Sequence, residues 1–156
     1  MVEYCQAQEQ DVATLVAYGE TFWKETIYYK EWGVEYDSYS VANMTRHLMN
    51  TGLVYFAHEK DDRSKIVGMI LMVESPLPMN NAYRITTEWV FYVDENWRNK
   101  GVGQQLIADA EWYMKQTGHR FMSMISLTNV TPEAAEGLYK SLGYQQTETS
   151  FTKELI

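Results

Sequence analysis

The stretch with the clearest chemistry is a glycine turn, RNKGVGQQL at residues 98–106, which follows a hydrophobic strand pattern and opens a helical one. The first N–H groups of a helix have no partner within it, and the helix dipole adds partial positive charge there. Gly101 and Gly103 would let a phosphate approach this backbone closely, with Arg98 and Lys100 as flanking cations. The turn is therefore a candidate pyrophosphate site. Taken alone, so short a glycine pattern favours an ordinary strand-to-helix loop, and it matches neither the dinucleotide fingerprint nor the nucleoside-triphosphate loop.

A second candidate is Glu88, a carboxylate in the middle of the apolar stretch ITTEWVFYV. On a regular strand its side chain shares a face with Thr86, Val90 and Tyr92. A carboxylate there is costly unless it is paired, solvated in a cleft or used in chemistry. Glu88 is thus a candidate general base. An equal alternative is that Glu88 is an ordinary polar residue, half-exposed on a strand that buries only one of its faces. A bulge near residues 90–92 would change the direction of its side chain.

The elements that must position these residues follow from hydrophobic periodicity. Helical spacing predicts helices near residues 11–27, 40–52, 101–118 and 132–143. Alternating or β-branched runs predict strands at residues 2–6, 53–59, 66–74, 84–94 and 121–127, and the tail from Tyr144 can add one or two more. This order predicts an α+β fold with one mixed, mostly antiparallel central sheet of about six to seven strands and four helices.

A later segment strengthens the interpretation of the glycine turn. VDENWRNKGVG at residues 93–103 and AAEGLYKSLGY at residues 134–144 together resemble the acetyl-CoA signature of the GNAT superfamily of N-acetyltransferases. The matching residues are Val93, Arg98, Gly101 and Gly103 in the first motif and Leu138, Tyr139, Gly143 and Tyr144 in the second. The predicted order of elements agrees with the family fold over nearly the whole chain. The resemblance therefore implies a single N-acetyltransferase domain over residues 1–156.

The resemblance implies that acetyl-CoA is a co-substrate and that a primary amine, on a small molecule or a protein, attacks it directly without an acyl-enzyme. The cofactor would pair with the splayed fourth strand and lie over the glycine turn. The implied contacts are Phe91, Val93, Arg98, Asn99, Lys100, Gly101, Val102, Gly103, Gln104 and Asn129. The sequence departs from the family pattern in three places: Glu95 replaces a frequent proline, Asn99 replaces a frequent glycine, and the spacing from Asn129 to Tyr139 is longer than usual.

Tyr139 is the candidate general acid, because it matches the family tyrosine that points at the thioester sulfur and a phenol carries a proton at neutral pH. The alternative places Tyr139 in the apolar face of its helix. Resemblance to the family also supports Glu88 as the base, with a chain of waters as the alternative.

The acceptor site is implied to lie under the segment IYYKEWGVEYDSYS at residues 27–40. Its rings suit a cationic amine through cation–π attraction, and Tyr28, Tyr29, Trp32 and Tyr36 are the candidate substrate contacts. The alternative is that these rings pack the loop onto the sheet.

Composition excludes several other classes of function. A net charge of −8, with no basic run longer than a pair, argues against nucleic-acid binding. The longest apolar run, IVGMILMV at residues 66–73, is too short to cross a bilayer, and the first residues do not read as a signal peptide. Cys5 is the sole cysteine, and the histidines are not spaced as a metal cluster. We therefore expect a cytoplasmic protein with no metal and no membrane partner.

Three alternatives stay open from the sequence. The chain could use another acyl-CoA, because no residue measures the acyl pocket. It could be a non-catalytic module that binds acetyl-CoA or a protein partner. Relatives of this kind are often homodimers, and the sequence carries no interface signature that decides the matter.

Overall fold

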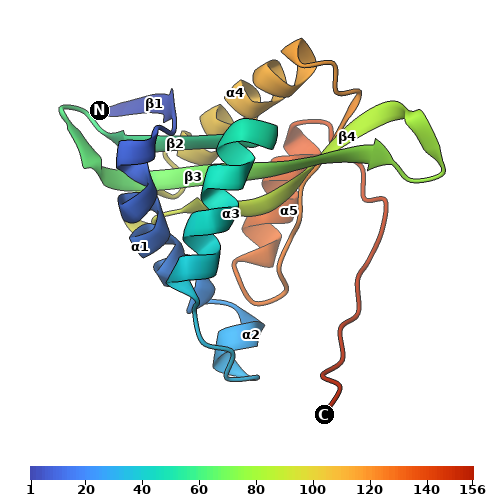
Figure 1. The fold of residues 1–156 in the computed structure, drawn as a ribbon, viewed down its shortest axis with the longest axis horizontal. Helices are drawn as coiled ribbons and strands as arrows, with labels where there is room; N and C mark the ends of the chain where they lie inside the picture. Colours follow the sequence, from blue (N-terminus) through green and yellow to red (C-terminus); the bar gives the residue numbers. More distant parts are fainter.

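The computed structural model describes residues 1–156 and shows one sheet between two layers of helices (Figure 1). The strands lie in the order β1 (Val2–Gln6), β2 (Leu53–Glu59), β3 (Asp62–Leu77), β4 (Asn80–Val93) and β5 (Phe121–Ser123). Neighbouring strands are antiparallel except for β4 and β5, which are parallel. The predicted α+β architecture with a mixed, mostly antiparallel sheet is confirmed.

Helices cover both faces of the sheet (Figure 1). The helices α1 (Val12–Trp23) and α3 (Ser38–Thr51) pack on one face, and α4 (Val102–Gln116) and α5 (Pro132–Ser141) pack on the other. A single turn, α2 (Ile27–Lys30), lies between α1 and α3, and two short 3₁₀ turns are η1 (Glu9–Asp11) and η2 (Glu95–Trp97). No helix combines the length and the apolar character needed to span a bilayer.

The number of elements differs from the prediction of six to seven strands and four helices, because the chain has five strands and five α-helices. The additional helix is α2, and the first predicted helix ends at Trp23 instead of reaching Ile27. The tail adds no strand, and residues 145–156 are exposed. An edge of only three residues in β5 offers few ladder hydrogen bonds to a further strand, and the largely polar tail has no apolar face to bury.

Strand β5 is shorter than the predicted 121–127 because the chain after it bonds to side chains instead of to a neighbouring strand. The N–H of Ile125 donates to Glu88, and its C=O accepts from Tyr139. Pairing between β4 and β5 is confined to Ile85–Thr87 against Phe121–Ser123. Residues 88–93 of β4 therefore have no strand partner on the β5 side, and the two strands splay apart there.

Candidate active site

A β-bulge in β4 decides where Glu88 points. Met72 of β3 pairs with Glu88 and Leu71 pairs with Val90, so Trp89 is an extra residue in β4. Trp89 and Val90 both pack against the core cluster on the α1 and α3 side. The alternation expected of a regular strand is broken at this point.

The prediction that Glu88 shares a face with Val90 and Tyr92 was therefore wrong. Beyond the bulge, Phe91 and Val93 pack against the cluster on the α4 and α5 side. Glu88 lies on this same side, because its carboxylate accepts a hydrogen bond from the chain after β5. The bulge thus directs the carboxyl group into the gap between β4 and β5.

Glu88 is almost fully buried from solvent. The residue is 7% exposed, and its Oε2 accepts a hydrogen bond of 2.9 Å from the N–H of Ile125. Burial raises the pKa of Glu88 from 4.5 to about 8, although the backbone of Ile125 and Phe91 and the hydroxyl of Tyr139 act in the opposite direction. Glu88 therefore holds a proton through most of the neutral range, and its pKa lies where a general base works best.

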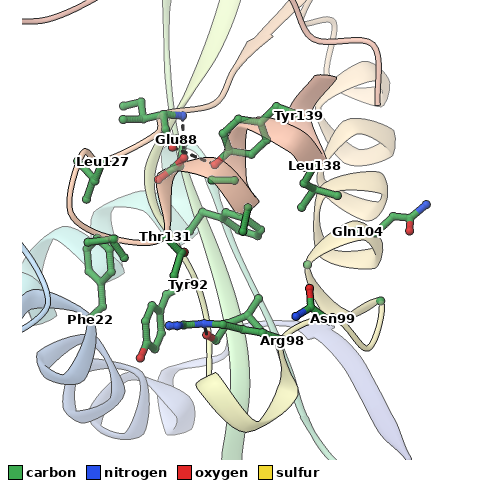
Figure 2. A pocket seen from close by; sticks show the side chains of 18 residues that line it. Phe22, Glu88, Tyr92, Arg98, Asn99, Gln104, Leu127, Thr131, Leu138 and Tyr139 are labelled. Atoms are coloured by element: carbon green, nitrogen blue, oxygen red, sulfur yellow. Dashed lines mark hydrogen bonds between the residues drawn. The ribbon is translucent and has the colours of Figure 1, made fainter. Parts of the chain in front are cut away.

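Tyr139 of α5 converges with Glu88 on one peptide unit (Figure 2). Its hydroxyl donates a hydrogen bond of 2.9 Å to the C=O of Ile125, whose N–H binds Glu88. Burial, and then the neighbouring Glu88 carboxyl, raise the pKa of Tyr139 above its ordinary value of 10.0. The phenol therefore keeps its proton at neutral pH. The two residues that the sequence singled out for proton transfer lie together in the structure.

The glycine turn presents a row of free backbone donors. The first hydrogen bond of α4 runs from the N–H of Gln105 to the C=O of Gly101, and the N–H groups of residues 99–104 donate no hydrogen bond within the chain. Gly101 has φ of 82°, a conformation that a side chain would strain. Gly103 serves close packing instead, because an added Cβ would lie 3.1 Å from Cζ of Phe91. The turn has the form of an anion site at a helix N-terminus.

Arg98 connects the glycine turn to β4 and to the chain that follows α1. Its Nε donates a hydrogen bond of 2.9 Å to the C=O of Val93. One of its terminal nitrogens lies 3.5 Å from Oε2 of Glu25, a residue that follows the end of α1. The guanidinium carbon also lies 5.3 Å from the ring centroid of Tyr92. The hydroxyl of Tyr92 in turn donates a hydrogen bond of 2.6 Å to Oε1 of Glu25. Sequence reasoning missed Glu25 and Tyr92, because neither carries a motif and their meeting depends on how α1 packs on β4.

A cavity of about 500 Å³ joins the glycine turn to the pair of Glu88 and Tyr139. In Figure 2, Asn99 and Gln104 lie at one end of it and Phe22 and Leu127 at the other. Among the predicted cofactor contacts, those that line the cavity are Phe91, Val93, Arg98, Asn99, Gly101, Gly103 and Gln104.

Three of the predicted cofactor residues do not line the cavity. Val102 is buried in the core beneath the turn. Lys100 is exposed, with its Nζ 5.2 Å from the ring centroid of Trp97. Asn129 is exposed in the loop before α5. Contacts from these residues to a cofactor stay predictions.

The aromatic segment after α1 packs partly on itself and partly on α1. Tyr28 stacks on Trp23 with centroids 5.6 Å apart and meets Trp32 edge-on at 5.2 Å. The hydroxyl of Tyr36 donates 2.7 Å to the C=O of Val16. None of the predicted substrate contacts Tyr28, Tyr29, Trp32 and Tyr36 lines the cavity. Phe22 does line the cavity, although its spacing in the sequence marks it only as part of the apolar face of the first helix.

The sequence profile of the Acetyltransferase (GNAT) family matches residues 20–144, which span β4, the glycine turn and α5. The chain belongs to the GNAT acetyltransferase family. The glycine turn and Tyr139 thus lie inside the region that defines membership of the family. No curated protein matches the chain in sequence.

Solved structures of GNAT acetyltransferases share the fold. An aminoglycoside acetyltransferase from an uncultured soil metagenomic sample is 19% identical with a TM-score of 0.74, over 100% of this chain and 99% of that one. A ribosomal-protein-alanine N-acetyltransferase from Brucella melitensis is 14% identical with a TM-score of 0.70, over 99% of each chain. A predicted acetyltransferase from Clostridium acetobutylicum, solved with acetyl-CoA, is 15% identical with a TM-score of 0.72, over 99% of this chain and 96% of that one. At these identities the likeness establishes the fold alone.

Proposed function

We propose that this GNAT protein transfers an acetyl group from acetyl-CoA to a primary amine of a small molecule or a protein by direct attack, with residues 1–156 acting as one N-acetyltransferase domain. One observation carries the proposal. A single cavity runs from the unpaired N–H groups of the glycine turn, along the unpaired edge of β4, to the pair of Glu88 and Tyr139. Family membership and the aminoglycoside acetyltransferases among the structural neighbours support it.

The residues present fit acetyl-CoA. The free N–H groups of residues 99–104 suit a pyrophosphate, and Gly101 and Gly103 carry no side chain that would stand in the way of its approach. The edge of β4 near Phe91 and Val93 has no strand partner on the β5 side, although the C=O of Val93 accepts from Arg98. This edge suits the amide-bearing pantetheine arm, which can add to a sheet edge as a strand does. When bound, acetyl-CoA supplies the activated acetyl thioester.

Two side chains of this chain would then move protons. Glu88, as its carboxylate, takes a proton from the acceptor ammonium directly or through a water, which leaves the neutral amine that can attack. The hydroxyl of Tyr139, which donates to the C=O of Ile125 in this structure, would turn toward the thioester sulfur and donate its hydrogen bond there. The departing thiolate would take the phenol proton, and the second proton released by the attacking nitrogen would restore the phenol. Since burial raises the pKa of Tyr139, we expect the proton to move late and the hydrogen bond to position the sulfur first.

Two measurements on the same preparation test the proposal. Calorimetry with acetyl-CoA reports cofactor binding, and thiol release with a panel of amines reports transfer. Binding together with turnover supports an N-acetyltransferase. Binding without turnover on any amine supports the non-catalytic module, and faster turnover with a longer acyl-CoA supports a different acyl donor. Failure to bind any acyl-CoA would overturn the proposal.

A further inference from the structure

We call the acceptor end the part of the cavity lining made by Phe22 and by four residues of the chain before α5, namely Ile125, Leu127, Val130 and Thr131; of these, Phe22 and Leu127 lie opposite the glycine turn. Phe22 comes from α1, and the other four come from the chain between β5 and α5. Figure 2 shows Phe22 and Leu127 across the cavity from Asn99 and Gln104. If acetyl-CoA lies over the glycine turn, as proposed above, this end is left for the amine. Four of its five side chains are apolar.

Negative charge is scarce in the lining of the cavity. Glu136 of α5 is exposed and lies outside this lining, with its Oε1 3.5 Å from Oγ of Ser126. Glu88 is the sole carboxyl group that lines the cavity. Glu25 lies nearby, but its Oε1 already accepts a hydrogen bond of 2.6 Å from Tyr92, and its Oε2 forms an ion pair with Arg98 at 3.5 Å. The guanidinium of Arg98 also lines the cavity and would repel a further cation. The acceptor end therefore offers a partner to one ammonium group.

The acidic residues of the aromatic segment add no further carboxylate to the lining of the cavity. Glu31, Glu35 and Asp37 are exposed and do not line the cavity. The carboxylate of Asp37 caps α3 by accepting from the N–H groups of Tyr39 and Ser40. Ile125 and Thr131 are exposed, whereas Phe22 is 9% exposed and Leu127 is partly buried. A second ammonium against Phe22 and Leu127 would lose water without gaining a partner, which is unfavourable. An apolar group in the same place gains the free energy of leaving water.

We propose, on the basis of the function proposed above, that the acceptor is a primary amine with a single positive charge, carried at the end of an apolar alkyl or aryl group. The amine meets Glu88, and the apolar group lies against Phe22, Leu127 and Val130. Polycations such as polyamines and aminoglycosides are poor acceptors, although aminoglycoside acetyltransferases share the fold. A free alkylamine and the side chain of a lysine both offer this chemistry.

Matched amines test the charge requirement. With saturating acetyl-CoA, kcat/KM is measured for hexylamine and for hexamethylenediamine, which has the same six carbons and a second ammonium group on the terminal one. We expect hexylamine to be favoured at least about tenfold, after correction for the two equivalent amines of the diamine. Along the series from ethylamine to hexylamine, kcat/KM should rise about fourfold per methylene until the acceptor end is filled. Equal or better use of the diamine, or of kanamycin, would overturn the inference.

The source of the amine is distinguished in the same assay. Phenylethylamine and hexylamine represent free amines, and Nα-acetyl-lysine methylamide represents a lysine side chain. Higher kcat/KM for the lysine derivative than for hexylamine indicates a protein acceptor, and the reverse order indicates a small molecule. Both results agree with the proposed chemistry, whereas low kcat/KM for all three beside efficient acetylation of spermidine contradicts it.

Substitutions locate the determinant. Leu127→Asp and Val130→Asp each place a second carboxylate at the acceptor end and should lower the preference for hexylamine over the diamine at least about tenfold. Thr128→Asp adds the same charge at an exposed position of the same loop and is the matched control, with an unchanged preference. An equal shift in the control would show that the preference reflects the charge of the whole surface.

Failure of this inference can be told from failure of the proposed function. Loss of acetyl-CoA binding in calorimetry would overturn the function itself. Acetyl-CoA binding with transfer to polyamines, and none to alkylamines, would leave the function standing and overturn the inference. Circular dichroism of each variant shows whether it folds, and agreement between the two aspartate variants guards against a local defect in either.

Discussion

At the scale of single residues, the buried carboxyl of Glu88 links function to stability. Its folded-state pKa of about 8 lies above the ordinary 4.5, so the folded protein binds this proton more tightly than the unfolded chain. The stabilising contribution is complete below about pH 4.5 and is lost as the pH rises toward 8, by up to about 1.4 kcal/mol per pH unit. Glu88→Gln should remove this slope. Urea unfolding between about pH 5 and 8.5 measures it, and an unchanged slope in the variant would assign it to other groups.

The same group should appear in the pH profile of the reaction. If Glu88 is the base, kcat/KM rises with pH as the carboxylate forms, with a midpoint near its pKa of about 8. Glu88→Gln should lower kcat/KM about a hundredfold and leave only the rise at higher pH that comes from deprotonation of the amine itself. Initial rates across this range measure both effects. A variant with the profile of the parent protein would point to water as the base.

Tyr144, which lies just beyond the end of α5, provides a matched control for Tyr139. Tyr139→Phe removes the hydroxyl that bonds to Ile125, and we expect kcat to fall at least about tenfold with little change in the Kd of acetyl-CoA. Tyr144→Phe removes a neighbouring hydroxyl that donates 2.8 Å to Glu111 outside the cavity, and its kcat should stay unchanged. Steady-state kinetics with calorimetry separates the two. Full turnover in Tyr139→Phe would return this residue to a packing role.

At the scale of elements, the start of α4 and the middle of α5 use glycine differently. A Cβ on Gly103 would lie 3.1 Å from Cζ of Phe91, so Gly103→Ala should move that ring into the cavity and weaken acetyl-CoA binding about tenfold or more. A Cβ on Gly137 of α5 would meet no atom within 4 Å. Gly137→Ala should therefore stabilise the fold by about 0.5–1 kcal/mol and leave acetyl-CoA binding intact. Thermal unfolding and calorimetry test the pair, and equal affinity in both variants would refute the role of Gly103.

The elements also show how far the sequence leads. Periodicity located the helices that carry the glycine turn and Tyr139, because their apolar faces are long and regular. Periodicity allowed a bulge near residues 90–92 but could not predict that one forms, at Trp89, because an extra residue is a property of the pairing with β3 rather than of β4 alone. The early end of β5 also depends on distant groups, since the peptide of Ile125 bonds to Glu88 and Tyr139.

The candidate site divides in the same way. Glu88, Tyr139 and the glycine turn were recognisable because each breaks a local rule or matches a spacing. The acceptor end was not recognisable, because Phe22 belongs to an ordinary apolar stripe and Leu127 to a loop without a motif. The rings expected to bind the amine do not line the cavity, and Tyr28 stacks on Trp23; a role of these rings in binding the amine stays a prediction.

At the scale of the whole molecule, net charge and local structure act against each other on an anionic cofactor. The chain carries a net charge of −8, and Arg98 at the turn is paired with Glu25. Lys100 is the remaining basic side chain at the turn, beside the acidic Asp94 and Glu95. The phosphates of acetyl-CoA would thus be held by uncharged N–H groups within a repulsive long-range field.

This balance predicts an unusual salt dependence. Salt screens the long-range repulsion and affects hydrogen bonds to backbone N–H groups little, so acetyl-CoA should bind about twofold or more tightly as sodium chloride rises from about 0.02 to about 0.3 M. Calorimetry or stopped-flow binding measures the change, and the gain should lie mainly in the association rate. Lys100→Gln should keep the trend and lower affinity at every salt concentration. Affinity that falls with salt in the parent protein, and loses this dependence in Lys100→Gln, would show that a side-chain cation holds the phosphates instead of the backbone.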